Sequence, residues 1–167
     1  MPILFFPHPS LRQSAKTVAD VDDDLRRLAD DMRETMKLAK GIGLAAPQVG
    51  RHQRLIVMDA DGFTATLANP QIIAAEGEFS MEEGCLSVPG VTGLVKRARC
   101  VTVSGLDMDG NTQTIDAEEL PAVCLQHEID HLDGVLFFDH LSVLKRMRLK
   151  NKYRKLKPEL KAKEGLI

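Results

Sequence analysis

Residues 120–132 contain the pattern His127-Glu128-x-x-His131, which restricts the structure of the chain more than any other stretch. In a helix with 3.6 residues per turn, both histidines fall on one face, where their imidazole nitrogens can bind one metal ion. Glu128 then faces the open position of that ion. Two acidic residues just before the segment, and Pro121 near its start, favour a helix. The pattern therefore predicts a helix that carries a mononuclear metal site of the hydrolase type.

The alternative is a pair of histidines that face solvent or pack in a core without binding a metal. Glu128 beside the first histidine, and apolar neighbours around the pair, favour the metal site, although the pattern also occurs by chance. Cys124 lies on the same helical stripe as the histidines. About 10 Å of helix rise separates it from His131, so the three side chains cannot surround one ion. We interpret Cys124 as a small buried side chain.

A catalytic ion also needs a third protein ligand and an open position for water. Phe137 stands where the metzincin pattern requires a third histidine, which argues against that class. A thermolysin-like site would need a glutamate from a later helix, but Glu159 and Glu164 lie in a lysine-rich segment. Asp139 and His140 remain as weaker candidates. The residues that follow the helix therefore leave the third ligand open.

The composition indicates one globular domain that spans residues 1–167. A chain of 167 residues with 44% hydrophobic content can bury one sizeable core. No apolar run approaches the roughly 20 residues that span a bilayer, and no charged-then-apolar leader precedes the first structured segment. We therefore expect a cytoplasmic protein with no membrane partner. Three cysteines, an odd number, indicate free thiols and a metal ligand rather than a disulfide framework.

Charge is distributed unevenly along the chain. The net charge of the whole chain is −2, yet residues 145–157 contain eight basic side chains and no acidic one, which leaves −10 on the remainder. One interpretation is a solvated surface helix. The other is a docking arm for a polyanion such as RNA.

The first fifty residues are predicted to form an extended arm, a helix and a glycine-rich loop. Three prolines disfavour a helix in residues 1–17. Residues 22–40 have apolar side chains at helical spacing, acidic residues at the start and Gly41 just past the end. Residues 41–50 contain Gly-x-Gly-x-x-Ala, but they follow a helix instead of a strand, so they are not a dinucleotide fingerprint. Gln48 adds an amide donor to this otherwise apolar loop.

Short strands are predicted after this loop. Alternating and β-branched runs indicate strands at residues 55–58, 64–68, 72–75, 100–106 and 111–115, with a hairpin turn at Asp109-Gly110. The second of these strands is expected to end at Asn69-Pro70. Residues 81–90 place Cys85 on a loop or strand end, beside Gly84. Taken alone, Cys85 has the alternative interpretation of a buried, inert thiol.

Three stretches together resemble the three motifs of peptide deformylases, in the order of that family. They are Gly41-Ile-Gly-Leu-Ala-Ala-Pro-Gln48, Glu83-Gly-Cys-Leu-Ser87 and Gln126-His-Glu-Ile-Asp-His-Leu132. Residues 3–12 and Asn69-Pro70 are also similar to that family, so the resemblance covers nearly the whole chain. It implies an α+β fold with short antiparallel or mixed strands in sheets around a central HExxH helix. It also implies an N-terminal helix and a basic C-terminal helix in residues 142–164.

The resemblance implies that Cys85 is the third metal ligand beside His127 and His131. It implies ferrous iron as the cofactor in cells, with nickel, cobalt or zinc as substitutes. The substrate would be an N-formyl-methionyl nascent peptide, which water activated by the ion hydrolyses to formate and a free amino group. Glu128 would act as general base and then as general acid.

The family pattern also implies which groups surround the reacting carbonyl. The side-chain amide of Gln48 and the backbone N–H of Leu86 would stabilise the oxyanion, and Glu83 is expected to pair with Arg97. Many bacterial members have a substrate-contacting arginine where Thr92 stands here, which leaves the substrate preference beyond formyl-methionine open. The methionine pocket would be formed by Ile42, Gly43, Leu44, Met81, Glu83, Gly84, Leu120, Val123 and Cys124.

The basic segment resembles the C-terminal helix by which bacterial deformylases dock on the ribosome, so ribosomal RNA is a further expected partner. A small HExxH metallopeptidase is the alternative enzyme, and a metal-binding or ribosome-associated module is the alternative without catalysis.

Overall fold

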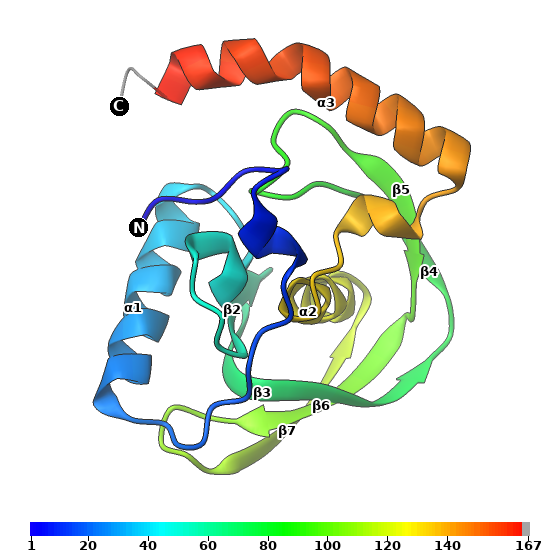
Figure 1. Cartoon of the computed structure of the whole chain (residues 1–167). Helices are drawn as coiled ribbons and strands as arrows, with labels where there is room; N and C mark the ends of the chain where they lie inside the picture. The colour runs from blue at the N-terminus through cyan, green and yellow to red at the C-terminus, as the bar shows by residue number, and fades with distance from the viewer. Residues whose placement is uncertain (165–167) are drawn as a thin grey trace.

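Helix α2 (Glu119–Leu132) lies at the centre of the molecule, and two sheets curve around it (Figure 1). The computed structural model describes the backbone of residues 1–164 and the side chains of residues 1–156. Helix α1 (Asp23–Leu38) lies on one flank, and α3 (Val143–Glu164) crosses the top of the view in Figure 1, at the end of the molecule away from β6 and β7. The arrangement is the α+β architecture expected from the sequence. The side chains of Lys157, Glu159 and Glu164 lie outside the described part.

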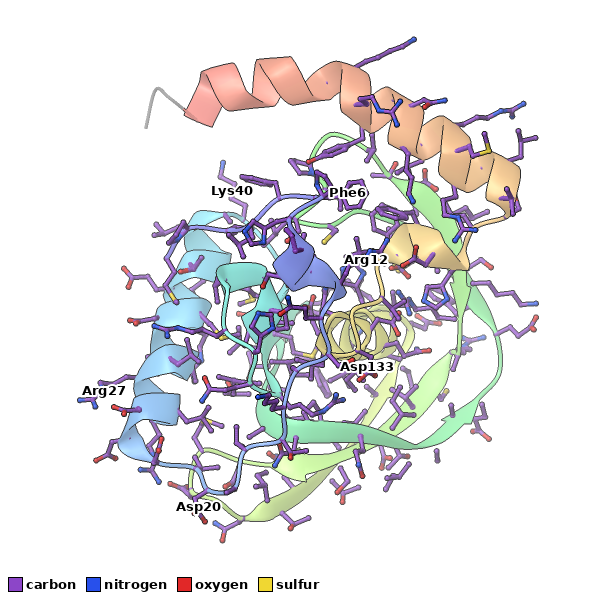
Figure 2. All side chains as sticks on the ribbon, viewed as in Figure 1. Phe6, Arg12, Asp20, Arg27, Lys40 and Asp133 are labelled. Atoms are coloured by element: carbon purple, nitrogen blue, oxygen red, sulfur yellow. The ribbon has the colours of Figure 1, made fainter. Side chains whose placement is uncertain are left out.

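Helix α1 confirms the prediction for residues 22–40. The Asp22 side chain caps it by accepting a hydrogen bond from Leu25 N at 2.8 Å, and the capping residue at its end is Ala39. One face of the helix packs against the sheet, while Arg27 points outward from the opposite face (Figure 2). The buried residues of the helix are Leu25, Leu28, Ala29, Met32, Thr35 and Met36.

The larger sheet has five antiparallel strands in the order β1-β2-β3-β6-β7. They are β1 (Gly43–Ala45), β2 (Leu55–Ala60), β3 (Phe63–Glu76), β6 (Cys100–Leu106) and β7 (Thr112–Glu118). The smaller sheet pairs β4 (Phe79–Glu83) with β5 (Gly93–Arg97). Strands β2, β6 and β7 and the hairpin between the last two confirm the sequence prediction. Strands β1, β4 and β5 lie in segments for which no strand was predicted.

Strand β3 corrects the prediction of two strands separated by Asn69-Pro70. The structure has one strand of 14 residues that passes through both. Proline is tolerated because the register with β6 shifts between Ala68 and Gln71, which is a bulge without a regular ladder bond. The Asn69 side chain instead bonds both the N–H and the C=O of Val18 at 2.9 Å. This bulge thus attaches the N-terminal arm to the sheet.

The N-terminal arm runs across the body of the molecule, as Figure 1 shows. The arm was predicted to be extended or turn-rich and to contain no helix, but residues Pro9–Arg12 form a short 3-10 helix. A proline in its first position and the His8 ring, which accepts from Ser10 N, favour that single turn. The arm also reaches both motif loops, because Leu4 N donates to the carbonyl of Gln48 and Phe6 N to that of Ser87.

Helix α3 is attached to the body through one face. Leu149 and Tyr153 are buried in a cluster with Phe137 and Phe138, and the Tyr153 hydroxyl donates to the Phe6 carbonyl at 3.0 Å. Figure 2 shows Phe6 beneath this helix. Its basic side chains mostly lie on the other faces and are exposed. Within the described residues, no helix is both long and apolar enough to cross a membrane.

Candidate active site

Three potential metal ligands converge where the turn after β4 meets α2. Cys85 is on that turn, and His127 and His131 are one turn apart on the helix. The Cys85 Sγ lies 3.3 Å from the His131 Nε2, which lies 3.2 Å from the His127 Nε2. All three donor atoms fall within 4.8 Å of one another. The structure therefore brings together one thiol and two imidazoles that are up to 46 residues apart in sequence.

The spacing of these donors fits a divalent transition metal. Metal–nitrogen bonds of about 2.0–2.1 Å and metal–sulfur bonds of about 2.3 Å in a tetrahedral site place the donor atoms roughly 3.3 to 3.6 Å apart. Thiolate and imidazole ligands suit iron, cobalt, nickel and zinc, whereas magnesium and calcium prefer oxygen. The His131 Nδ1 is buried and meets no partner in the described part of the chain. Burial lowers the pKa of His131 well below its usual value, which keeps the ring neutral and able to bind a metal.

Glu128 is a buried carboxyl in the wall of a cavity beside these ligands. Its side chain is almost fully enclosed, and Oε2 has no hydrogen-bond partner among the residues described. Burial raises the pKa of Glu128 to about 7, although His127 and Arg97 oppose the shift. A carboxyl that titrates near neutral pH and faces a cavity is suited to general acid–base catalysis.

A buried ion pair orients His127. The His127 Nδ1 donates to Glu83 Oε2 at 2.9 Å, which leaves Nε2 directed at the other ligands. Arg97 donates to both oxygens of the same carboxylate, at 2.5 and 3.0 Å, and both side chains are 4% exposed. Burial opposes the charge on Glu83, but the hydrogen bonds from His127 and Arg97 outweigh it and lower its pKa. The Glu83–Arg97 pair expected from the sequence is thus confirmed.

Gln48 presents its amide nitrogen to the site. Its Oε1 accepts from Ala45 N at 2.8 Å, and its Nε2 donates to Ser87 Oγ at 3.1 Å and lies 3.7 Å from Cys85 Sγ. Ser87 is fully buried, and the sequence interpretation assigned no role to this partner of Gln48. Its position in the stretch Glu83–Ser87, beside Cys85, was the feature of the sequence that could have pointed to it. Ser87 fixes the orientation of the Gln48 amide.

The cavity beside Glu128 has a volume of about 420 Å³, which is typical of small-ligand sites of roughly 300–1,000 Å³. Eight of the nine residues expected around the methionine pocket line it: Ile42, Gly43, Met81, Glu83, Gly84, Leu120, Val123 and Cys124. Gln48, Cys85, Leu86, His127 and Glu128 line it as well. Further lining residues that were not expected are Lys40, Gly41, Glu82 and Pro89.

The side chain of Leu44 is the exception. Successive side chains of a strand point to opposite faces, so Gly43 and Ala45 face α2 while Leu44 faces α1. Leu44 is fully buried in the cluster under α1 and is not among the residues that line the cavity. Its expected place in the pocket wall is therefore wrong for the side chain.

The sequence model of the family described as polypeptide deformylase matches residues 1–147. The chain belongs to this family. A peptide deformylase of Alkalilimnicola ehrlichii is 54% identical over 158 residues, which cover 92% of this chain and 89% of that protein. Deformylases of this family are metal-dependent hydrolases, so the chain is an enzyme of this kind.

Solved deformylase structures have the same fold. The structure from Legionella pneumophila matches with a TM-score of 0.91 at 48% identity and covers 96% of each chain. The structure from Synechococcus elongatus, which is a complex with actinonin, matches with a TM-score of 0.86 at 42% identity, over 91% of this chain and 86% of that one.

The remaining residues considered as ligands lie elsewhere in this deformylase fold. Cys124 is not part of the donor cluster, and burial raises the pKa of its thiol well above the usual value. Asp139 pairs with Arg12, and His140 bonds Asp130. The interpretation of Cys124 as a small buried side chain is confirmed. Cys85, by contrast, is in the cluster of potential donor atoms with His127 and His131.

Proposed function

We propose that this chain removes the formyl group from the N-terminal methionine of nascent peptides. We further propose that Cys85, His127 and His131 hold one divalent metal ion for this reaction. One observation carries the proposal: three metal-binding donors and the buried carboxyl of Glu128, which has no partner among the described residues, meet at one cavity. Membership of the deformylase family agrees with it.

The residues around the cavity can be assigned to successive steps of formamide hydrolysis. When bound, the ion supplies Lewis-acid activation of water and of the formyl oxygen. Glu128 takes the proton of the attacking water and then delivers it to the amine that leaves. The Gln48 amide and the Leu86 N–H donate to the oxygen that becomes negative. The bonds of Gln48 with Ala45 and Ser87 support this role, because they hold its amide in place before substrate arrives.

We propose ferrous iron as the native metal, with nickel, cobalt or zinc as substitutes. A thiolate and two imidazoles accept all four ions, so the resemblance to the family is what favours iron. The substrate methionine would fill the apolar part of the cavity, between Ile42 on one side and Leu120 and Val123 of α2 on the other. An apolar slot of this kind discriminates modestly among side chains of similar size.

We also propose that residues 1–167 form one catalytic domain that works in the cytoplasm at the ribosome. Nascent formylated chains emerge there, and α3 presents a basic surface that suits ribosomal RNA. The buried face of α3, formed by Leu149 and Tyr153, supports this idea because it anchors the helix without using the exposed basic side chains.

The decisive experiment measures formate release from a formyl-methionyl peptide. Protein prepared without oxygen and loaded with ferrous iron or nickel is compared with Glu128→Ala. We expect a loss of activity of about 10²-fold or more in the variant with its metal retained, since general acid–base catalysis contributes that much. Cleavage of an N-terminally blocked peptide without formate release would instead favour the metallopeptidase alternative.

A further inference from the structure

A line of hydrogen bonds runs from His127 to the surface, and the proposed reaction uses only its inner part. Glu83 accepts from His127 at 2.9 Å and from Arg97 at 2.5 and 3.0 Å. Beyond Arg97 lie Asp130 and His140, which so far have no role. The Asp130 Oδ2 accepts from the Arg97 Nη1 at 2.8 Å and from the His140 Nε2 at 2.7 Å.

Arg97 is the element that couples the two ends of this line. Its side chain is 4% exposed, and its planar guanidinium bonds Glu83 on one side and Asp130 on the other. A guanidinium presents its N–H groups in a rigid fork, so it cannot turn toward one carboxylate without weakening its bonds to the other. Asp130 therefore restricts the orientation of Glu83, and through Glu83 that of the His127 ring, by way of its bond to Arg97.

His140 restricts Asp130 in turn. The Asp130 side chain is 24% exposed, so water competes for its oxygens unless protein donors hold it. His140 ends the short 3-10 helix Phe137–His140, whose two phenylalanines are buried in the core. The backbone of His140 is thereby fixed, and its ring donates to Asp130 from an element that does not belong to α2.

We propose that Asp130 and His140 are positioning residues for the metal ligand His127. Asp130 orients the guanidinium of Arg97 through a hydrogen bond, and His140 orients Asp130 in the same way. The inference rests on the proposed metal site and concerns how firmly that site holds its ion. Partners that orient a ligating histidine typically change metal affinity by about 10- to 100-fold, and residues farther from the metal have smaller effects.

The test uses the full chain loaded with Co²⁺, whose affinity is measured by competition with a chelator. The visible absorption spectrum of the cobalt protein reports the geometry of the site independently of activity. The variants are Asp130→Asn, His140→Ala, His140→Gln and the double variant Asp130→Asn/His140→Ala. Glu78→Gln is the matched control, because Glu78 pairs with Lys96 beside Arg97 but lies outside the line of bonds. Thermal unfolding of each metal-free variant shows whether it has folded.

We expect Asp130→Asn to weaken Co²⁺ binding about 10-fold and His140→Ala about 3-fold, with a changed spectrum in both. The double variant should match Asp130→Asn, since His140 acts through Asp130. His140→Gln keeps a side-chain N–H that can reach Asp130, so its Co²⁺ affinity should be close to that of the wild-type chain. Glu78→Gln should match the wild-type chain.

Two results would overturn the inference. The first is wild-type affinity and spectrum in folded His140→Ala and Asp130→Asn. The second is an effect of His140→Ala that persists undiminished in the Asp130→Asn background. Should the wild-type chain itself fail to bind Co²⁺, the proposed metal site would fall together with this inference. If the wild-type chain binds Co²⁺ and the variants bind it with the same affinity and spectrum, the proposed metal site is retained and only the positioning role is rejected. If Asp130→Asn does not fold, the two His140 variants still decide the matter.

Discussion

Gly43 and Glu128 lie so close together that there is no room for a methyl group between them. A Cβ at position 43 would lie 2.3 Å from Glu128 Oε1 and 2.8 Å from Cys124 Sγ. Gly43→Ala is therefore expected to push the carboxylate aside and to lower kcat/KM by about 10²-fold, as small displacements of catalytic groups do. Metal content and thermal unfolding serve as controls. Wild-type kcat/KM in this variant would show that Glu128 has more freedom than the structure indicates.

Thr92 bonds Glu82, which lines the cavity, and many bacterial relatives are expected to have an arginine at this position. Its hydroxyl donates to Glu82 Oε1 at 3.0 Å, and both side chains are exposed. Thr92→Arg adds a donor for the peptide backbone, so we expect KM for formyl-Met-Ala-Ser to fall about 2- to 5-fold with kcat unchanged, the range of an exposed charged contact.

Glu82→Gln is the control, because Thr92→Arg also breaks the hydrogen bond from Thr92 to the Glu82 carboxylate, and that alone could change KM. If Glu82→Gln lowers KM as much as Thr92→Arg does, the gain comes from removing a negative charge and not from the new guanidinium.

The short helix Phe137–His140 depends on one carboxylate for its start. Asp139 accepts from Leu136 N at 2.9 Å and pairs with Arg12 of the N-terminal arm. Burial opposes its charge, but the bonds from Arg12 and Leu136 outweigh it and lower the pKa of Asp139. A lowered pKa stabilises the fold above the pKa of the unfolded chain, about 3.9, and this contribution is lost as the pH falls through the folded value.

Asp139→Asn should therefore reduce the free energy of unfolding by about 1 kcal/mol at pH 7, the typical contribution of a capping side chain. The difference from the wild-type chain should shrink as the pH is lowered below 4 in urea titrations. Asp24→Asn is the control, since Asp24 and its partner Arg27 are exposed and such pairs contribute little. A difference that stays constant down to pH 2 would contradict this assignment.

Helices α1 and α2 and most of the main sheet could be predicted because their signals are local. Helix α1 has an aspartate cap and helical apolar spacing, and β6 and β7 are joined by an Asp-Gly turn. Strands β4 and β5 could not be predicted, because each has only five residues and no strong apolar run. They pair only with each other and are held in place by tertiary packing. The bulge that carries Pro70 through β3 likewise depends on contact with the arm.

The candidate site could be predicted where its residues form a local pattern. The spacing of His127 and His131 predicts a shared ligand face, but from local pattern alone Cys85 had an inert alternative, because only the fold brings its sulfur to the helix. Ser87 and Asp130 act through side chains distant in sequence, so no spacing reveals them. Leu44 was misplaced because β1 was not predicted. Only in a strand does the Leu44 side chain point to the face opposite to Gly43 and Ala45.

Helix α3 concentrates basic side chains at one end of the molecule. Of the basic residues in α3, Arg146 and Lys150 face the body, near Asp139 and the Phe138 ring respectively. Among the α3 side chains that the structure describes, up to residue 156, the exposed basic ones are Lys145, Arg148, Lys152, Arg154 and Lys155. Counterion release makes binding of such a surface to RNA fall steeply with salt.

Replacing these five exposed residues with glutamine should abolish most ribosome binding while kcat and KM for short formyl-peptides stay the same. Sedimentation with ribosomes at several salt concentrations measures the first effect, and formate release measures the second. Ribosome affinity that survives both the substitutions and high salt would show that α3 is not the docking element.

Helix α2 contacts β1, β2, β3, β6 and β7, so it is enclosed more completely than the turn that carries Cys85. Its amide hydrogens should therefore exchange with solvent mainly when the whole fold opens, whereas the turn after β4 can open locally. In the proposed metal site, His127 and His131 would then stay in place while the Cys85 thiolate moves away from the ion whenever the turn opens. The residence time of a bound ion would be set by how often that turn opens.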